Sequence, residues 1–340
     1  MDRRAATIAG ALALLLSIAV LGAVLPAPFV ALGRGPTFDT LGAVNGTEVV
    51  AIRNLPTYPT SGHLNMTTVG VETQLTMLDT LAYWAAGDRR VVPRSTLFPP
   101  DIPPAEVAEQ NRQQFLDSQT AAEVAALGYL GLPTTVLVDG LTDGSASAGV
   151  LAPQDVILAV AGRPVDTFDD LRGALAGTHP GQQVTVRFQR GDAPPQEATV
   201  TLGTRPDGPD GALGLVPGVR PSDDNDIVIS LGDIGGPSAG LMFALAVVDK
   251  LTPGELAGGR FIAGTGTIGP FGAVGPINGI PFKMLVASEV GATVFLVPAA
   301  NCAEALATAP EGLRLVRIDD LAGAVAALET LDSGGVPASC

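Results

Sequence analysis

The sequence predicts a multidomain α+β protein that begins with a transmembrane helix. Three observations lead to this fold class. Residues 5–33 contain no ionisable side chain, whereas charged residues are spread over the rest of the 340-residue chain. Short alternating strands and one helix are expected over 119–208, and apolar strands alternate with glycine-rich turns and helices over 215–332. Residues 34–118, between the transmembrane helix and the first of these domains, are expected to form a β-rich membrane-proximal region.

Residues 1–33 are expected to anchor the chain in a membrane. The run 7–24 is almost wholly Ala, Leu, Ile, Val and Gly, and a helix of this length crosses about 30 Å of hydrocarbon. Arg3 and Arg4 precede it, so the positive-inside rule places the N-terminus in the cytoplasm and the rest of the chain outside. The alternative is a cleaved signal peptide, whose apolar core is shorter, about 7 to 15 residues. Length favours a retained single-pass anchor in the cell membrane.

Composition excludes several classes of partner and cofactor. The chain has 34 acidic and 19 basic residues, a net charge of −15, and nucleic-acid binding needs clustered Lys and Arg. We therefore expect no nucleic-acid partner. The two histidines, His63 and His179, are far apart in the sequence, so we expect no histidine-based metal site. We also expect no cofactor. Two cysteines do not make a disulfide framework; Cys302 is expected to be a small buried residue, although pairing with Cys340 outside the cell stays open.

The region 34–118 mixes short β-branched runs with Pro and Gly. The segment VNGTEV carries an Asn-Gly turn signal, which is typical of a β-hairpin. Paired prolines in LFPPDIPPAEV indicate an extended connection. The pattern predicts a small β-rich module and gives no indication of its function.

Residues 119–208 are expected to form a small domain of strands with one helix. We expect a strand at VLVDGL, a helix from Thr167 to about Ala176, and two alternating strands at QQVTVRFQR and QEATVTL. The segment GSASAGVLAPQDVILAVAG resembles the GSPAxGxLxxGDVIxxVNG pattern of bacterial PDZ domains, with Gln154 where that family usually has Gly. The resemblance implies that a peptide adds as a strand beside the sheet. The binding loop it implies contains Leu132, Pro133, Thr134 and Thr135. A small β domain that serves as a spacer is the alternative.

A serine lies at the start of an apolar helix in the last third of the chain. Ser238 follows Pro237 in a glycine-rich turn and precedes Ala239 and Gly240. Such a turn supplies exposed backbone N–H groups and the positive end of a helix dipole, which are the ingredients of an oxyanion hole. Serine is also a preferred N-cap residue, and position alone favours that interpretation.

A candidate proton acceptor elsewhere in the sequence favours a nucleophilic role for Ser238 over a capping role. Serine is a weak nucleophile that needs an adjacent base. The chain has 17 arginines and two lysines, and Lys283 lies in the apolar segment GIPFKMLVA, with Ile280 and Ala287 at helical spacings. Burial lowers the pKa of a lysine, so that its amine can be neutral and act as a base. Lys250, beside Asp249 at a helix end, fits an ordinary surface lysine.

These residues carry a strong resemblance to the proteolytic domain of Lon proteases. GGPSAG and, downstream, TGTIGPFGAVGPINGIPFKMLVA are similar to the two segments that hold the Ser-Lys dyad of that family. The resemblance implies that Ser238 is the nucleophile, that Lys283 is the general base and that Thr265 helps to orient them. With an anchor and a PDZ module ahead, the whole chain resembles the membrane-anchored PDZ and Lon-domain proteases of Gram-positive bacteria, the YlbL-like family. Lon domains often form rings, so the resemblance leaves a homo-oligomer open.

The lysine count also bears on ATP. A P-loop needs G-x-x-x-x-G-K-[ST], but Lys250 follows Asp and Lys283 follows Phe, so this chain is not a P-loop ATPase. We therefore expect an ATP-independent serine endopeptidase that cleaves extracytoplasmic peptides or flexible segments recruited by the PDZ domain. The alternatives are a non-catalytic membrane scaffold and a hydrolase of non-peptide esters.

Overall fold

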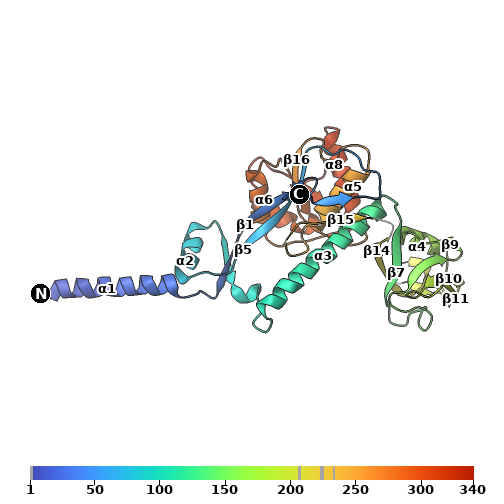
Figure 1. Cartoon of the computed structure of the whole chain (residues 1–340), viewed down its shortest axis with the longest axis horizontal. Coiled ribbons are helices and arrows are strands. Elements are labelled where there is room, and N and C mark those ends of the chain that lie inside the picture. Colours follow the sequence, from blue (N-terminus) through green and yellow to red (C-terminus); the bar gives the residue numbers. More distant parts are fainter. Residues whose placement is uncertain (1–2, 206–207, 223–225, 233) are drawn as a thin grey trace.

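The computed structural model describes residues 3–205, 208–222, 226–232 and 234–340. It begins with the helix α1 (Arg3–Val24), which projects from the body of the molecule as a single rod (Figure 1). Within α1, the segment Thr7–Val24 is long and apolar enough to cross a membrane, and none of it is buried in the protein. Two larger sheets form the rest of the molecule, and they lie at the centre and at the far end from α1 (Figure 1).

The central sheet joins strands from both ends of the sequence. Its order is β20-β19-β16-β5-β1-β6, in which β5, β16, β19 and β20 run parallel and β1 and β6 complete one edge. The strand bounds are β1 (Phe29–Asp39), β5 (His63–Glu72), β6 (Arg90–Pro93), β16 (Phe261–Gly264), β19 (Val294–Pro298) and β20 (Arg314–Ile318). Packed on this sheet are α5 (Gly240–Leu251), α6 (Ile280–Glu289), α7 (Cys302–Ala307) and α8 (Leu321–Asp332).

The expected membrane-proximal module is therefore not separate. Strands β1 and β5, which lie within 29–72, belong to the same sheet as the strands of the last third of the chain. The physical reason is the apolar side of β5: Leu64 and Met66 are almost fully buried in one core with α5. The Asn-Gly turn signal does form a hairpin, between β2 (Ala43–Val44) and β3 (Thr47–Glu48), with positive φ at Asn45 and Gly46.

The prolines expected to mark an extended connection stand before a long helix instead. The helix α3 (Pro104–Tyr129) begins at the last of these prolines and runs from the central sheet to the second sheet (Figure 1). Its Phe115 packs edge-on against Phe243 of α5, with 5.8 Å between the ring centres. Proline is well tolerated in the first turn of a helix, because its missing N–H is not needed there.

The second sheet has the elements expected for 119–208. Its order is β11-β10-β8-β7-β14, with β9 (Arg163–Pro164) beside β8. The bounds are β7 (Thr134–Leu141), β8 (Val156–Val160), β10 (Gln183–Gln189), β11 (Gln196–Thr201) and β14 (Leu215–Pro221), and the helix is α4 (Phe168–Leu175), capped by Thr167. Gln154 takes the left-handed conformation, φ 71°, which explains why glycine suits this position. Because β14 pairs with β7, this sheet extends beyond residue 208, the boundary expected from the sequence.

The remaining short elements connect these parts. The strand pairs are β4 (Val50–Ile52) with β15 (Ile227–Ile229), β12 (Gly203–Arg205) with β13 (Gly208–Ala212), and β17 (Thr267–Ile268) with β18 (Val274–Gly275). Two single 3-10 turns are η1 (Arg94–Thr96) and η2 (Ala299–Asn301). The helix α2 (Met77–Ala86) lies between β5 and β6, next to the end of α1 (Figure 1).

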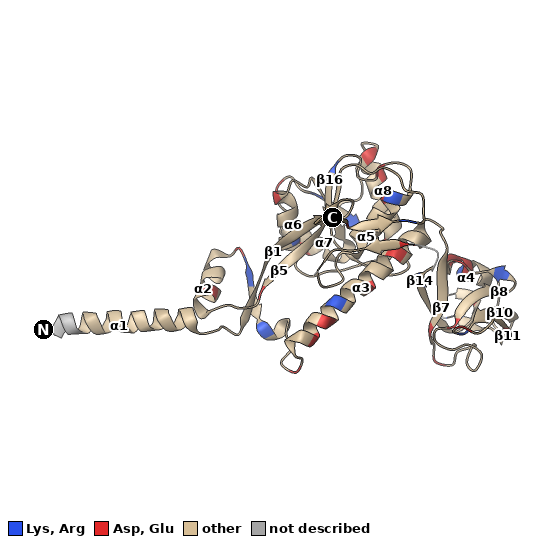
Figure 2. Ribbon diagram, viewed as in Figure 1, with Lys and Arg blue, Asp and Glu red and all other residues tan. Residues whose placement is uncertain are grey.

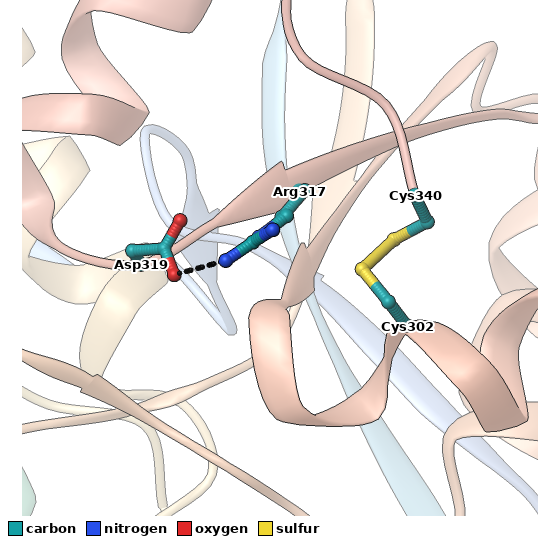
Figure 3. Close-up of a disulfide and its surroundings, with 4 residues drawn as sticks. All are labelled: Cys302, Arg317, Asp319 and Cys340. Carbon is teal, nitrogen blue, oxygen red and sulfur yellow. Dashed lines mark hydrogen bonds and ion pairs between the residues drawn. A yellow bond between two sulfur atoms is a disulfide. The ribbon is translucent and has the colours of Figure 1, made fainter.

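A disulfide joins Cys302, at the start of α7, to Cys340 (Figure 3). The pairing corrects the expectation that Cys302 is a small buried thiol. The C-terminal segment reaches Cys302 because it pairs with β20: the Arg317 N–H donates to the carbonyl of Ala338 at 3.0 Å. This disulfide closes the tail onto the outer edge of the central sheet.

Candidate active site

Ser238 stands at the turn that leads into α5. The preceding Gly236 has φ 89°, a left-handed value that favours glycine, and the helix begins two residues after the serine. The N-cap residue of α5 is Ala239, and no side chain caps this helix end. The alternative interpretation of Ser238 as a capping residue is therefore wrong, and its hydroxyl is available for another partner.

That partner is the amine of Lys283. The lysine lies on the first turns of α6, which begins after Gly279 in the left-handed conformation. Its side chain is 2 % exposed, and Ile280, Met284 and Ala287 are fully buried around it, as the helical spacing predicts. The Nζ atom lies 2.9 Å from Ser238 Oγ. Two residues 45 positions apart in sequence thus meet at hydrogen-bonding distance.

Two further oxygens bind the same amine. Nζ donates to the carbonyl of Thr67 at 2.7 Å and to Thr265 Oγ1 at 3.1 Å. The parallel pairing of β5 and β16 sets Gly264 opposite Met66, so the next residues, Thr265 and Thr67, lie side by side. Thr265 Oγ1 in turn donates to the carbonyl of Ser238 at 2.9 Å, which ties the base and the serine to one threonine.

Burial decides the protonation state of this lysine. Loss of water around the amine lowers the pKa of Lys283 from 10.5 to about 7. A neutral amine has two N–H donors and one lone pair. The carbonyl of Thr67 can only accept, and the proton of Thr265 Oγ1 is already directed to Ser238 O, so both donors are assigned to these oxygens. The lone pair is left to accept the proton of Ser238 Oγ.

Lys250, the other lysine of the chain, has a different environment from Lys283. Lys250, expected at the surface, has a side chain that is 12 % exposed, and its Nζ donates to the carbonyl of Val50 at 2.6 Å. Its apolar stem is covered, while the ammonium pairs with the exposed Glu48 at 3.4 Å. This lysine fastens α5 to β4 and has no serine or threonine hydroxyl among these partners.

The helix α3 supports the turn before Ser238. The N–H of Gly236 donates to the carbonyl of Asn111 at 2.9 Å, and Ser118 Oγ donates to the carbonyl of Pro237 at 3.1 Å. No sequence pattern singles out Asn111, Ser118 or Thr67 as part of this site. Thr67 and Asn111 act through their own backbone carbonyls, which leave no trace in a residue pattern, and Ser118 acts through its hydroxyl from a helix that the prolines obscured.

A cleft of about 460 Å³ opens beside the serine. Its walls include Pro237, Ala239 and Lys283 together with Ile277 and Asn278 from the segment before α6. Gly240, expected in the turn, is the first residue of α5 and is closely packed: a Cβ there would lie 2.7 Å from Ile268 Cγ2 and 2.9 Å from Ser118 Oγ. A glycine at this position lets α5 pack closely against its neighbours.

None of the four residues of the expected peptide-binding loop lines this cleft. Thr134 and Thr135 are paired with Pro221 and Arg220 of β14, so the edge of β7 is already occupied by a strand of the same chain. Among the described residues, no cluster of three His, Cys, Asp or Glu side chains could hold a metal ion.

Comparison with known proteins assigns both folded parts. Residues 128–202 match the family model of the PDZ domain, and residues 227–322 match that of the Lon protease (S16) C-terminal proteolytic domain. A Lon protease of Heliobacterium modesticaldum is 33 % identical over 114 residues, which are 32 % of this chain and 14 % of that protein. The chain thus spans about one seventh of the length of this relative.

Solved structures of PDZ domains are also among the similar proteins. The PDZ domain of an SdrC-like protein from Listeria monocytogenes is 20 % identical, covering 24 % of this chain and 85 % of that one, with a TM-score of 0.23. Its counterpart from Listeria innocua is 18 % identical over 24 % of this chain and 92 % of that one, also with a TM-score of 0.23. On the family matches, the chain contains a PDZ domain and a serine protease domain of the Lon type, which confirms the expected fold class.

Proposed function

We propose that this chain, with its PDZ domain and Lon-type protease domain, is an ATP-independent, membrane-anchored endopeptidase that uses a Ser238–Lys283 dyad. The observation that carries the proposal is the 2.9 Å separation of Lys283 Nζ and Ser238 Oγ in a site where the lysine is 2 % exposed. A neutral amine beside a serine hydroxyl is the arrangement that nucleophilic catalysis requires.

The reaction follows from the hydrogen bonds of the amine. Ser238 Oγ attacks the carbonyl carbon of a scissile peptide bond while Lys283 Nζ takes the hydroxyl proton. Backbone N–H groups at the start of α5 stabilise the negative oxygen of the tetrahedral intermediate, favoured by the helix dipole. The resulting ammonium gives its proton to the leaving amine, and an acyl-enzyme remains. Water, deprotonated by the same lysine, then releases the acyl product and restores Ser238.

Thr265 has a positioning role in this scheme. It accepts from Lys283 and donates to the carbonyl of Ser238, so it holds both partners at once. The carbonyl of Thr67 fixes a second N–H of the amine. Together they direct the lone pair of the neutral lysine to the hydroxyl proton of Ser238.

Independence of ATP rests on the two lysines of the chain. Neither can complete a nucleotide-binding P-loop, and Lys283 is already committed to the proposed dyad. Without an unfolding motor, the substrates are peptides and flexible protein segments that enter the cleft in an extended form.

We place the protease domain outside the cytoplasm. Arg3 and Arg4 before the apolar span favour a cytoplasmic N-terminus. The Cys302–Cys340 disulfide supports the same orientation, because disulfides persist in oxidising compartments and are rare in the cytosol.

The PDZ domain presents peptides to the protease domain in this proposal. A peptide cannot add as a strand at Thr134 and Thr135 of the expected loop 132–135, because β14 already pairs with β7 there. Thr134 nevertheless lines a neighbouring cavity. This cavity, of about 260 Å³, lies between the start of α4, Val219 of β14 and the turn at Pro270–Gly272 of the protease domain. Phe168 of α4 stacks on Phe271 of that turn, with 4.1 Å between ring centres. A peptide bound in this cavity would contact both domains.

Cleavage of an unstructured protein such as casein tests the proposal. The detergent-solubilised chain is incubated with this substrate without nucleotide, alongside Ser238→Ala and Lys283→Ala variants. We expect cleavage by the wild-type chain and none by either variant. Activity that survives either substitution would refute the dyad. An inactive wild-type chain would favour a PDZ scaffold, and cleavage of esters but not of peptides would favour the ester hydrolase.

A further inference from the structure

The helix α2 turns its apolar side chains outward. Met77, Leu78, Leu81 and Trp84 are 40 %, 43 %, 59 % and 78 % exposed, and no residue of α2 is buried. Polar side chains of α2 are engaged in hydrogen bonds instead: Asp79 completes a capping box with Thr76, and the hydroxyl of Tyr83 donates to Glu72 at 3.0 Å. An apolar patch of this kind on a folded protein marks a contact surface.

The place of α2 in the fold identifies what it contacts. The α2 N-terminus is fastened to the end of the apolar span: the Met77 N–H donates to the carbonyl of Leu25 at 3.3 Å, and the Ala27 N–H donates to that of Leu75 at 2.7 Å. A Cβ placed on Gly22 of α1 would lie 3.2 Å from Leu78 Cγ. Figure 1 shows α2 across the end of α1 rather than along its length.

The depth of this junction matches a membrane boundary. The 18 residues of Thr7–Val24 rise about 27 Å as a helix, close to the thickness of the hydrocarbon layer. Gly22 and Leu25 therefore stand where hydrocarbon gives way to headgroups. Tryptophan is enriched at that level, because its ring is apolar and its indole N–H is polar. The segment Thr7–Val24 has no charged residue and α2 has one, Asp79, so charged positions are sparse on both helices (Figure 2).

We propose that α2 is an interfacial helix that lies on the bilayer surface with Leu78, Leu81 and Trp84 inserted among the headgroups and upper acyl chains. The inference rests on the membrane anchoring proposed above. It adds a second membrane contact to the span, one that lies across the end of α1 and restricts rotation about it.

This contact fixes the orientation of the protease domain on the membrane. α2 follows β5, the strand whose Thr67 carbonyl binds Lys283, and β1 follows α1 directly. Both membrane elements are thus continuous with strands of the catalytic sheet. The distance and orientation of the cleft relative to the bilayer are therefore restricted, unlike those of a domain joined to its anchor by a flexible linker.

The single tryptophan of the chain, Trp84, reports on the contact directly. The full chain is reconstituted in phosphatidylcholine vesicles that contain lipids brominated either near the headgroup or near the bilayer centre. We expect blue-shifted emission, strong quenching by the shallow bromines, weaker quenching by the deep ones, and a several-fold lower sensitivity to aqueous acrylamide than for an exposed indole.

A matched pair of variants isolates the α2 surface. Leu81→Glu is expected to shift the emission to the red and to raise acrylamide quenching several-fold. Leu306→Glu, at an equally exposed leucine on α7, is expected to leave both unchanged, since Leu81 and Leu306 are 59 % and 58 % exposed. Both variants should cleave casein like the wild-type chain, because neither residue lines the cleft.

Three outcomes would overturn the inference. Trp84 fully open to acrylamide in a chain that resists carbonate extraction would refute the contact of α2 and leave the anchor intact. Blue-shifted emission without bromine quenching would show that protein, such as a second copy of this chain, covers the helix. Extraction by carbonate would refute the anchor and this inference with it, while the casein assay tests the dyad separately.

Discussion

Lys283 donates a 2.7 Å hydrogen bond to the carbonyl of Thr67, a residue 216 positions earlier in the chain. The proposed base is therefore held by β5, a strand from the N-terminal part of the chain. The residues that match the Lon proteolytic domain begin only at 227 and do not include this strand. The protease fold in this chain is completed by β1 and β5, and a fragment that contains the matched residues alone would lack one of the three partners of the amine.

The pH dependence of cleavage should follow the pKa of Lys283. Burial lowers this pKa to about 7, and only the neutral amine can accept the serine proton. We expect kcat/KM to rise through about pH 7 and to reach a plateau above it, measured with a fluorogenic peptide. Lys283→Arg should be inactive across the range, since arginine stays protonated. A flat profile from pH 5 to 9 would contradict a lysine base.

The same burial should appear in the pH dependence of stability. Between about pH 7 and pH 10.5 the unfolded chain keeps the proton of Lys283 and the folded chain does not. Because stability rises with pH where the unfolded state binds more protons, this group adds up to about 1.4 kcal/mol of unfolding free energy per pH unit in that window. Below pH 7 both states hold the proton and the slope from this group vanishes.

Denaturant titrations of the wild-type and Lys283→Met chains measure this slope. Methionine keeps most of the volume of the side chain and cannot titrate. The difference between the two slopes isolates Lys283, because all other groups are common to both. Equal slopes from pH 7 to pH 10 would show that the amine is solvated in the folded chain.

Thr265 should affect the rate rather than substrate binding. Thr265→Val removes the hydroxyl that binds both Lys283 and the carbonyl of Ser238. We expect kcat to fall on the order of a hundredfold, with KM little changed, because misdirected proton transfer slows the chemical step. Thr265→Ser retains the hydroxyl and should restore most of the rate. Equal losses for Val and Ser would indicate a packing role only.

The proposed site was largely predictable from the sequence because its three side chains lie in short motifs. Ser238, Thr265 and Lys283 each stand in a segment with a distinctive pattern, and the structure places them within hydrogen-bonding distance. The turn that carries Ser238 was predictable from its glycines. The rest of the site was not, since Thr67 and Asn111 act through backbone carbonyls that any residue supplies.

The domain boundaries were harder to predict than the elements. The hairpin at Asn45–Gly46 and the helix capped by Thr167 follow from local signals, and both form. Strand pairing between distant segments has no such signal. The pairing of β5 with β16 and of β14 with β7 depends on which apolar faces pack together in the folded chain. The first pairing merges the expected region 34–118 with the protease domain, and the second extends the expected domain 119–208 beyond residue 208.

Loss of the disulfide should destabilise the C-terminal part of the protease domain. The bond closes a loop with 38 residues of sequence separation, which corresponds to about 3–4 kcal/mol of chain entropy in the unfolded state. Cys302→Ser should lower the unfolding free energy by about 2–4 kcal/mol, measured by denaturant titration. Cys340→Ser should have the same effect, and the double variant should be no worse than either single one. As a control, dithiothreitol should lower the unfolding free energy of the wild-type chain and leave that of these variants unchanged.

Gly240 should be intolerant of any side chain. A Cβ at this position would lie 2.7 Å from Ile268 Cγ2 and 2.9 Å from Ser118 Oγ, so Gly240→Ala must push α5 away from both. We expect a loss of about 1–3 kcal/mol in unfolding free energy, the usual cost of overpacking, and a lower kcat because α5 carries the turn of Ser238.

Gly173→Ala on α4 is the matched control: a Cβ there meets nothing within 4 Å. Alanine in that exposed helix should instead raise stability by about 0.5–1 kcal/mol. Opposite signs for the two substitutions, with activity lost only at Gly240, would show that the fit of α5 against α3 and β17 sets the position of the serine.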